Sequence, residues 1–184
     1  MNVYFTASIV GRDRNLQNYR KIIDILTTKG FKVMSDHIMN TSPEKIRMET
    51  KEERLKFHSQ LEKNIRSADF MVIESTFPSI SVGYEISIGL HFRKPVLILY
   101  SNGDPPSLLA HHADEKLICE KYTPDTVKEI IDDFVNYIEG KQDTRFTFFI
   151  TPEIAHFLEK KSQREKLPKS VYLRKLIEKE MKNK

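Results

Sequence analysis

The alternation of short apolar runs with helical patterns constrains the fold of this chain more than any other feature. Five runs rich in strand-forming residues predict β-strands, and several of them are apolar at consecutive positions. Strands that are apolar on both sides are typical of a parallel sheet covered by helices on both faces. We therefore expect an α/β, Rossmann-like (flavodoxin-like) fold with a parallel five-stranded sheet. The expected strands are residues 3–8, 31–38, 69–75, 95–100 and 115–122.

Four segments between or after these strands are expected to be helices. The first, residues 16–30, has apolar residues at helical spacing and ends at Gly30. The second is expected from about residue 51 to residue 67. Residues 123–140 have start signals at Thr123 and Pro124 and a terminator at Gly140. The remaining helix follows the third strand and is expected to carry Glu85 in its first turn.

The polar segment 140–145 interrupts the α/β pattern and is the expected domain boundary. Residues 1–141 would form the α/β domain and residues 142–184 a small C-terminal unit. The C-terminal unit contains 11 Lys and Arg against 6 Asp and Glu, a net charge of +5, whereas residues 1–141 carry 19 against 20, a net charge of −1. This asymmetry favours nucleic acid or another anionic partner for the C-terminal unit, although a solvated basic helix at a terminus is the commoner cause of such charge.

Composition and cysteine usage predict a cytoplasmic protein. No apolar run approaches the roughly 20 residues that span a bilayer, so no membrane segment is expected. The first residues lack the positive charge of a signal peptide. Cys119 is the single cysteine, which excludes an intramolecular disulfide and a cysteine metal cluster. We expect neither a metal ion nor a cofactor.

Polar residues after the strands would meet at one edge of the sheet, where doubly wound folds bind ligands. Ser79, Ser81 and Gly83 lie at the expected start of a helix, where hydroxyl and backbone N–H groups suit a phosphate. Glu85 lies in the same segment. Two interpretations stay open from spacing alone. The serines are helix caps and Glu85 is an ordinary helix-start charge, or Glu85 is a reactive carboxylate beside a ligand.

Several sequence blocks resemble one enzyme superfamily. They are VYFTASIVGRD at residues 3–13, His37 with Ile38, and residues 57–100, which contain FPSISVGYE at 77–85. These blocks are similar to the nucleoside 2-deoxyribosyltransferase-like superfamily, and most to its 2'-deoxynucleoside 5'-phosphate N-hydrolases, which share a P-S-x-x-V-G-Y-E block. The resemblance covers about residues 2–135. It implies hydrolysis of the N-glycosidic bond of a (deoxy)nucleoside 5'-monophosphate.

The resemblance also implies roles for individual residues. Glu85 would be the catalytic nucleophile that attacks C1' of the sugar, and the Tyr4 hydroxyl would orient its carboxylate. Ser79 stands where the transferases carry an aspartate facing the 5'-hydroxyl, and a serine there favours a 5'-phosphate because it can donate a hydrogen bond to it. The other positions that the resemblance implies contact substrate or phosphate are Ser8, Ile9, Gly11 and His37, and His37 would lie near the base; Ser81 and Gly83 are expected there from their place at the helix start alone.

Three positions depart from the family pattern. The second catalytic aspartate of the family falls on Leu61, its arginine falls on Val10, and one of its glycines is Ser81. Glu62 is the neighbour of Leu61, but one step along a helix rotates a side chain by about 100°. An efficient hydrolase, a slower enzyme, an enzyme for a different nucleotide and a pocket that only senses nucleotide all remain open.

The last forty residues resemble a ribbon-helix-helix unit of the Arc/MetJ type. The resemblance implies a strand at residues 145–150, two short helices, and a homodimer or higher homo-oligomer, because one strand and two helices bury too little surface alone. It also implies double-stranded DNA as a partner, with contacts from the strand and from the start of the second helix. The residues at those positions are Arg145, Thr147, Lys169 and Ser170. The alternatives are a nucleotide-sensing DNA-binding regulator and a dimerisation unit that does not contact DNA.

Overall fold

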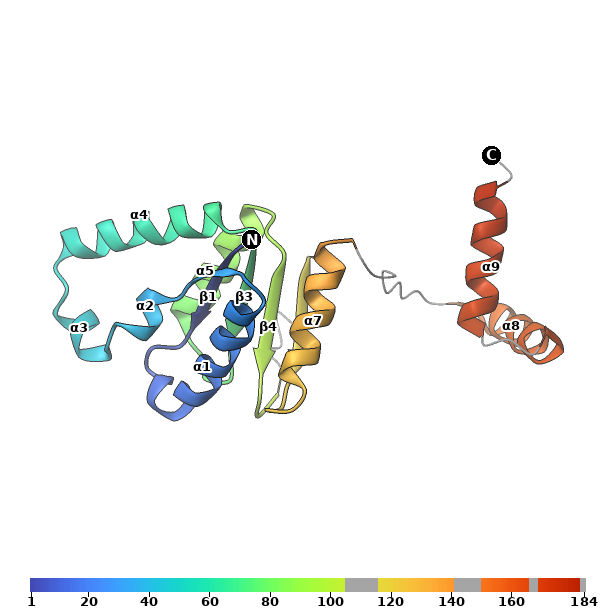
Figure 1. Ribbon diagram of the computed structural model, residues 1–184, viewed down its shortest axis with the longest axis horizontal. Helices are drawn as coiled ribbons and strands as arrows, with labels where there is room; N and C mark the ends of the chain where they lie inside the picture. The colour runs from blue at the N-terminus through green and yellow to red at the C-terminus, as the bar shows by residue number, and fades with distance from the viewer. Residues whose placement is uncertain (105–115, 141–149, 166–168, 183–184) are drawn as a thin grey trace. The chain divides into compact units, whose positions relative to one another are not determined.

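The computed structural model describes residues 1–104, 116–140, 150–165 and 169–182; the side chains of residues 162, 163, 165, 169–171, 174 and 178 are not described. The chain divides into two compact units, Met1–Asp143 and Thr144–Lys184. The larger unit contains the sheet, and the described part of the smaller unit contains two helices (Figure 1).

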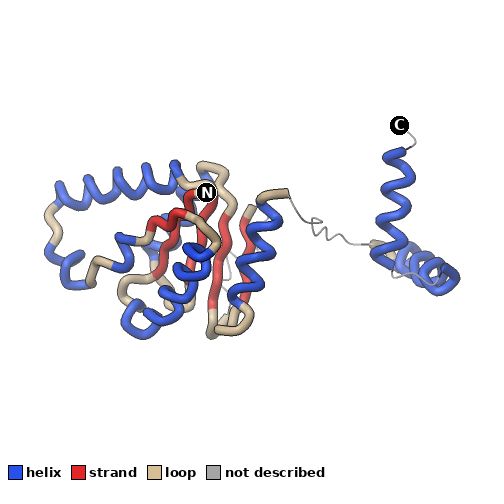
Figure 2. The backbone as a smooth tube through the Cα atoms, viewed as in Figure 1, coloured by secondary structure: helices blue, strands red, loops and turns tan. Residues whose placement is uncertain are grey.

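The larger unit is built on a parallel five-stranded sheet with the strand order β2-β1-β3-β4-β5 (Figure 2). Its strands are β1 (Asn2–Ala7), β2 (Lys32–Met34), β3 (Phe70–Glu74), β4 (Val96–Tyr100) and β5 (Leu117–Lys121). β1 pairs with β2 on one side and with β3 on the other, so the winding of the chain reverses between β1 and β3. The expected flavodoxin-like α/β fold is confirmed. Such a reversal point is where doubly wound sheets bind their ligands.

Helices cover both faces of this sheet (Figure 1). α1 (Arg12–Thr28) and α7 (Val127–Ile138) pack on one face, around Phe5 and Val72. α4 (Lys51–Ser67) and α5 (Ile80–His91) pack on the other face, around Tyr4 and Met71. Every residue of β3 is buried, which explains the apolar run that precedes Glu74 in this strand. The two-sided core holds α5 firmly against the strands that end at the candidate site.

The ends of several helices follow from local chemistry. α4 begins after Thr50, whose side chain accepts a hydrogen bond from the Glu53 N–H at 3.2 Å, while the Glu53 carboxylate accepts one from the Thr50 N–H at 2.7 Å. This reciprocal capping box accounts for the agreement between the expected and observed bounds of α4. Beyond the end of α1, Gly30 has a φ of +81°, a conformation that favours glycine.

Two expected elements differ from the structure. The run 31–38 forms only the three-residue strand β2, and the chain then turns into the short helix α2 (Asp36–Met39). β2 is an edge strand that pairs with β1 alone, so fewer backbone hydrogen bonds are available to lengthen it. α7 begins at Val127 rather than near Thr123, because the side chains of Thr123 and Thr126 accept hydrogen bonds from each other's backbone N–H groups.

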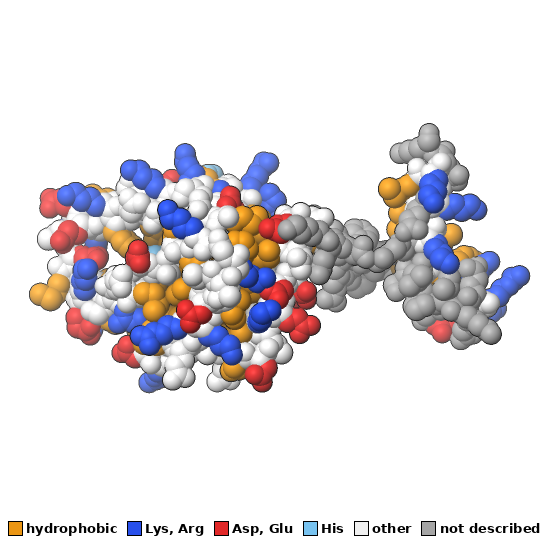
Figure 3. Space-filling view, in the orientation of Figure 1, with side chains coloured by type: hydrophobic (Ala, Val, Ile, Leu, Met, Phe, Trp, Pro, Cys, Tyr) orange, Lys and Arg blue, Asp and Glu red, His pale blue; other side chains and the backbone are white. Residues whose placement is uncertain are grey.

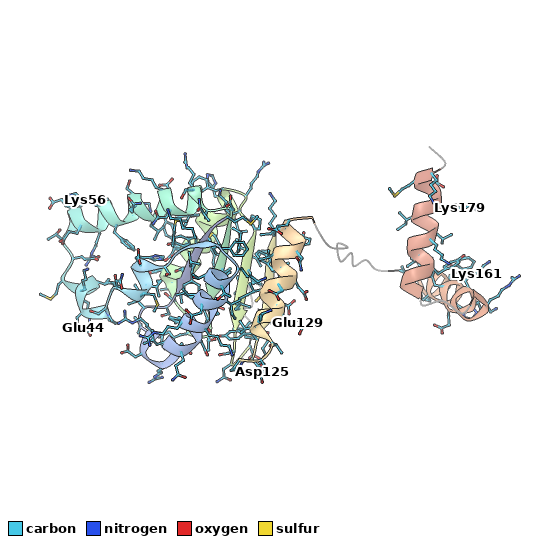
Figure 4. The ribbon with its side chains drawn as sticks, viewed as in Figure 1. Glu44, Lys56, Asp125, Glu129, Lys161 and Lys179 are labelled. Atoms are coloured by element: carbon cyan, nitrogen blue, oxygen red, sulfur yellow. The ribbon has the colours of Figure 1, made fainter. Side chains whose placement is uncertain are left out.

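α3 (Pro43–Met48) connects α2 to α4 and completes the described helices of the larger unit. Figure 4 labels Glu44 on α3 and Lys56 on α4. No helix within the described residues has the length and apolar character needed to cross a membrane.

The smaller unit contains α8 (Pro152–Glu165) and α9 (Lys169–Lys182), at the two expected helical segments. The expected strand 145–150 lies outside the described residues, apart from Ile150. Among the described side chains of this unit, Leu158 and Tyr172 are buried. Apolar and basic side chains are visible together on its surface (Figure 3). The large apolar side chains that remain exposed are Ile150, Ile154, Phe157, Leu176, Ile177 and Met181.

Candidate active site

Glu85 lies on the face of α5 that packs against the sheet, and only 5% of the residue is exposed. The hydroxyl of Tyr4, on β1, donates a hydrogen bond to Glu85 Oε2 at 2.9 Å. No described residue donates a hydrogen bond to the second carboxylate oxygen, Oε1. The carboxylate is therefore held through one oxygen, while the other is not engaged by the described side chains.

The position of Glu85 on its helix differs from the expectation. α5 begins at Ile80, with Ser79 as its N-cap, so Glu85 lies in the second turn and the first turn contains no acid. The interaction of a carboxylate with the helix macrodipole falls off within the first turn. The expected placement of Glu85 in the first turn is therefore wrong, and the macrodipole does not account for this residue. A buried carboxylate is costly unless it is hydrogen-bonded, and Tyr4 supplies that bond.

Tyr4 acts on Glu85 as a hydrogen-bond donor. Burial of the ring, followed by the negative charge of Glu85 and the hydrogen bond to it, raises the pKa of Tyr4 far above its ordinary value. The hydroxyl therefore keeps its proton at neutral pH. Because Tyr4 is fully buried in the central part of the sheet, its hydroxyl has little freedom to move away from Glu85.

His37, on α2, lies beside the same carboxylate. Its Nε2 atom is 3.8 Å from Glu85 Oε2, beyond hydrogen-bonding distance, and its ring stacks on the Tyr4 ring with the centroids 4.9 Å apart. Nε2 is buried and has no hydrogen-bond partner among the described residues. Thr6 lies two residues after Tyr4 on β1, hence on the same face of the sheet, and its buried hydroxyl likewise lacks a described partner. Unpaired buried polar atoms are costly, and these two are available to a water molecule or a polar ligand.

Arg12 anchors the segment that carries His37. Its guanidinium donates hydrogen bonds to the backbone carbonyls of Ile38 at 3.2 Å and Met39 at 3.3 Å, and also to the carbonyl of Thr41. Val10, on which the family arginine falls by resemblance, lies two residues before Arg12. Val10 itself is 68% exposed. Arg12 thus has a structural task that no local sequence signal identifies, because its acceptors lie more than 25 residues away.

His37 is one of the residues that line a groove with a volume of about 650 Å³. One side is formed by residues 32–37, which comprise the edge strand β2 and the start of α2. The opposite side is one face of α4, and its lining residues there are Phe57, Gln60, Leu61 and Asn64. This volume lies within the range of about 300–1,000 Å³ that is usual for small-molecule sites. The i, i+3, i+4, i+7 spacing on α4 is a sequence signal that could have identified this side of the groove.

The position of the second family acid contains no carboxylate. Leu61 points into the larger unit, is 7% exposed and lines the groove. The adjacent Glu62 instead lies 3.8 Å from Arg66, one turn along α4, and its side chain is 43% exposed. The described groove therefore has an apolar side chain, Leu61, at the position where the resemblance implies an acid.

The loops after β1 and β3 meet at the carboxyl edge of the sheet. A Cβ atom added to Gly11 would lie 2.4 Å from Phe77 Cβ, so only glycine permits this approach of the two loops. The Ser8 hydroxyl is buried and accepts a hydrogen bond from the Gly11 N–H at 3.2 Å. Ile9 is half-buried against the core. The structure therefore gives Ser8, Ile9 and Gly11 a well-packed loop beside the β3–α5 loop.

The start of α5 exposes the other expected phosphate-binding residues. Ser79 caps the helix, and its hydroxyl oxygen accepts from the Val82 N–H at 3.5 Å. Ser81 is exposed, and nothing lies within 4 Å of a Cβ atom added to Gly83. Ser79 and Ser81 precede Glu85 by about one to two turns of α5, and Gly83 precedes it by about half a turn.

The four expected DNA-binding residues have no described side chains. Arg145 and Thr147 lie outside the described residues. Lys169 and Ser170 are the first two residues of α9, and only their backbone is described. Within the part of the chain that the structure describes, no three His, Cys, Asp or Glu side chains are grouped so that they could hold a metal ion.

Comparison with known proteins supports the resemblance of the larger unit. No family model matches the chain. The protein named 2'-deoxynucleoside 5'-phosphate N-hydrolase 1 of Methanosarcina barkeri is 32% identical over 135 residues, which cover 72% of this chain and 84% of that protein. The protein of the same name from Methanosarcina mazei is 31% identical over 136 residues, which cover 73% of this chain and 83% of that protein. The 5-hydroxymethyl-dUMP N-hydrolase of Rattus norvegicus is 32% identical over 99 residues, which cover 54% of this chain and 60% of that protein.

A solved structure shows the same fold. The CMP N-glycosidase of Clostridium botulinum superposes with a TM-score of 0.52 at 14% identity, covering 72% of this chain and 99% of that one. The Methanosarcina relatives match over most of their own length at more than 30% identity. The chain therefore belongs to the 2'-deoxynucleoside 5'-phosphate N-hydrolase family, within the nucleoside 2-deoxyribosyltransferase-like superfamily.

Proposed function

We propose that this protein hydrolyses the N-glycosidic bond of (deoxy)nucleoside 5'-monophosphates with Glu85 as its nucleophile. One observation carries the proposal: among the described residues, a buried carboxylate at the ligand-binding edge of the sheet is hydrogen-bonded through Oε2 alone. The names of the relatives, which are N-hydrolases of nucleoside 5'-phosphates, agree with this chemistry.

The reaction would proceed in two displacements. Glu85 Oε1 attacks C1' of the sugar through an oxocarbenium-like transition state, and the base leaves with the electron pair of the C–N bond. Water then attacks C1', the ester bond to Glu85 breaks, and the sugar 5-phosphate is released. In both steps the Tyr4 hydroxyl holds Oε2 by its hydrogen bond and so keeps Oε1 directed at the substrate.

The phosphate would bind at the start of α5. The backbone N–H groups of a helix N-terminus attract anions, and the hydroxyl of Ser79 still has its hydrogen available to donate. A phosphate at this end of α5 would lie on the same helix as Glu85, which fits a nucleotide whose 5' end and C1' contact the same element. A free nucleoside would lack this interaction.

The test is release of free base from a panel of ribo- and deoxyribonucleoside 5'-monophosphates, followed by chromatography. The wild-type protein is expected to release base from at least one of them, and Glu85→Gln to release none while still binding that nucleotide. Glu62→Gln is the matched control, because it removes a glutamate from the outer surface of α4. If the wild-type protein binds a nucleotide but releases no base from any of them, the enzyme is ruled out in favour of a nucleotide sensor.

A second function is proposed for the C-terminal unit: a DNA-binding dimerisation tail that responds to nucleotide in the larger unit. Its net charge of +5 favours an anionic partner. Its exposed apolar residues, which include Phe157 on α8 and Ile177 on α9, favour burial against a second copy of the unit. Figure 4 labels Lys161 and Lys179, basic residues of these two helices.

Two measurements on the full chain test the tail. Sedimentation should give a dimer for the wild-type protein and a lower mass for Phe157→Glu, with Lys179→Glu as the surface control. Binding to a random double-stranded DNA library should weaken steeply with salt and weaken further in Arg145→Ala. A monomeric wild-type protein, or DNA binding that is unchanged after removal of residues 142–184, would rule the tail function out.

A further inference from the structure

Cleavage of an N-glycosidic bond leaves an electron pair on the departing base, which must accept a proton to leave easily. A positioned proton donor typically contributes about 10²- to 10⁴-fold to such a step. Leu61, at the position of the second family acid, has no proton to give. The proposed reaction therefore needs a donor from elsewhere in this chain.

The groove contains few alternatives within the described residues. Lys32, Asp36 and Lys45 line it, but all three are exposed rather than held beside Glu85. The Tyr4 hydroxyl is committed to Glu85 Oε2, and its raised pKa makes it a poor acid. Glu62 lies on the outer surface of α4, beside Arg66.

His37 differs from all of these groups in its surroundings. Its Nε2 atom is buried, lacks a described hydrogen-bond partner and lies 3.8 Å from Glu85 Oε2. Among the residues that line the groove, His37 is the one with a described contact to Glu85. Glu85 is not among the residues that line the groove, so His37 is the described link between the groove and the carboxylate, and a base bound in the groove would lie near its ring.

The ring of His37 is also held in place. It stacks on Tyr4 at an interplanar angle of 18°, and the ring of Phe57 lies 6.4 Å away on the α4 side. Arg12 fixes the backbone immediately after it through the carbonyls of Ile38 and Met39. A fixed donor loses little entropy when it meets the substrate, which is the property that general acid catalysis requires.

We propose that His37 is the proton donor to the leaving base, in the place of the acid that Leu61 replaces. The inference rests on the proposed N-glycosidase function. As Glu85 Oε1 forms its bond to C1', the C1'–N bond breaks, its electron pair moves onto the base, and the imidazolium Nε2–H proton passes to the base. His37 is then neutral. When water attacks C1' and the ester bond to Glu85 breaks, the proton of the water passes to Nε2, so that His37 and Glu85 return to their starting forms.

This role has a consequence that a structural role does not share. A leaving group that departs as a stable anion needs no proton, so the loss of a proton donor affects it little. A p-nitrophenyl glycoside of the sugar 5-phosphate provides such a leaving group, whereas a natural nucleotide requires protonation of its base. The effect of removing His37 should depend on the leaving group, while the effect of removing the nucleophile should not.

The experiment compares wild-type protein with His37→Gln and His37→Asn on both substrates: the nucleotide that the wild-type protein cleaves best, and the corresponding p-nitrophenyl glycoside 5-phosphate. We expect kcat for the nucleotide to fall at least 100-fold in both variants, and kcat for the p-nitrophenyl substrate to fall less than 10-fold, which also shows that the variants are folded. His58→Gln is the matched control, since His58 is exposed and bonded to Tyr84.

The two proposals fail in different ways. A wild-type protein that cleaves neither substrate overturns the proposed function. A wild-type protein that cleaves the nucleotide, while His37→Gln reduces both substrates equally or reduces neither, overturns the role of His37 and leaves Glu85 as nucleophile. If the p-nitrophenyl substrate is not cleaved by the wild-type protein, base release is compared between nucleotides whose bases differ in acidity. A rate that depends no more steeply on base acidity in His37→Gln than in the wild type then overturns the role.

Discussion

Replacement of Tyr4 by Phe tests the link between the central strand and the candidate nucleophile. The substitution removes the hydroxyl that donates to Glu85 Oε2 at 2.9 Å and leaves the ring in its fully buried place. A hydrogen bond to a charged group contributes about 1.5–3 kcal/mol, and its loss here leaves a buried carboxylate without its described donor. We expect the free energy of unfolding to fall by about that amount.

The rate of base release should fall as well, because Glu85 Oε1 points at C1' only while the Tyr4 hydroxyl holds Oε2. A misplacement of a reacting group by about 1 Å can cost about 100-fold in rate, so we expect kcat to decrease by about 10- to 100-fold in Tyr4→Phe. The assays are urea unfolding followed by circular dichroism and base release under saturating nucleotide.

A matched control and a double-mutant cycle separate this effect from a general loss of packing. Tyr84→Phe removes a hydroxyl that bonds His58 at the surface, and it should change stability by no more than about 0.5 kcal/mol. In a Glu85→Gln background the hydroxyl faces a neutral amide, so Tyr4→Phe should cost about 1 kcal/mol less than in the wild type. An equal cost in both backgrounds would refute the reasoning that the hydroxyl serves the carboxylate.

Three further predictions concern other parts of the larger unit. Burial, with the charge of Glu120, raises the pKa of Cys119 from 9.0 to about 11, so its reaction with a disulfide reagent at pH 8 should be about 100-fold slower than that of a free thiol; an equal rate would contradict this. Burial raises the pKa of Glu74, so the folded state binds more protons than the unfolded one, and the free energy of unfolding should fall as pH rises above 4.5. Glu74→Gln should flatten that slope in urea titrations from about pH 4 to pH 8, and an unchanged slope would argue against it. Gly11→Ala would bring a Cβ to 2.4 Å from Phe77 Cβ and should cost about 1–3 kcal/mol in thermal unfolding, whereas a neutral result would show that the two loops separate freely.

The sheet could be predicted from the sequence because its three inner strands are buried on both sides. The runs that became β3 and β4 are apolar at consecutive positions, and burial on both faces follows from that pattern. The run at 31–38 was extended too far, since an edge strand depends on one partner and its length is decided by pairing rather than by composition. The start of α7 was misplaced for a local reason, the reciprocal hydrogen bonds of Thr123 and Thr126.

The candidate site could be predicted only in part. Tyr4, His37 and Glu85 were expected from the resemblance to one family, and the structure brings these three residues together. Nothing in the spacing of the residues indicated that Arg12 would hold the backbone after His37, because the fold alone brings its acceptors near. The prediction that Glu85 lies in the first turn of α5 was also wrong, because the start of that helix depends on Ser79 as its cap.

The central claim is that Glu85 forms a covalent bond to C1' of the sugar. A nucleoside 5'-monophosphate with fluorine at C2' slows the second displacement, so the intermediate should accumulate on the wild-type protein. Mass spectrometry of the digested protein should then find the sugar 5-phosphate attached to the peptide that contains Glu85, and to no peptide in Glu85→Gln. Base release with no adduct, or an adduct on another residue, would contradict the account.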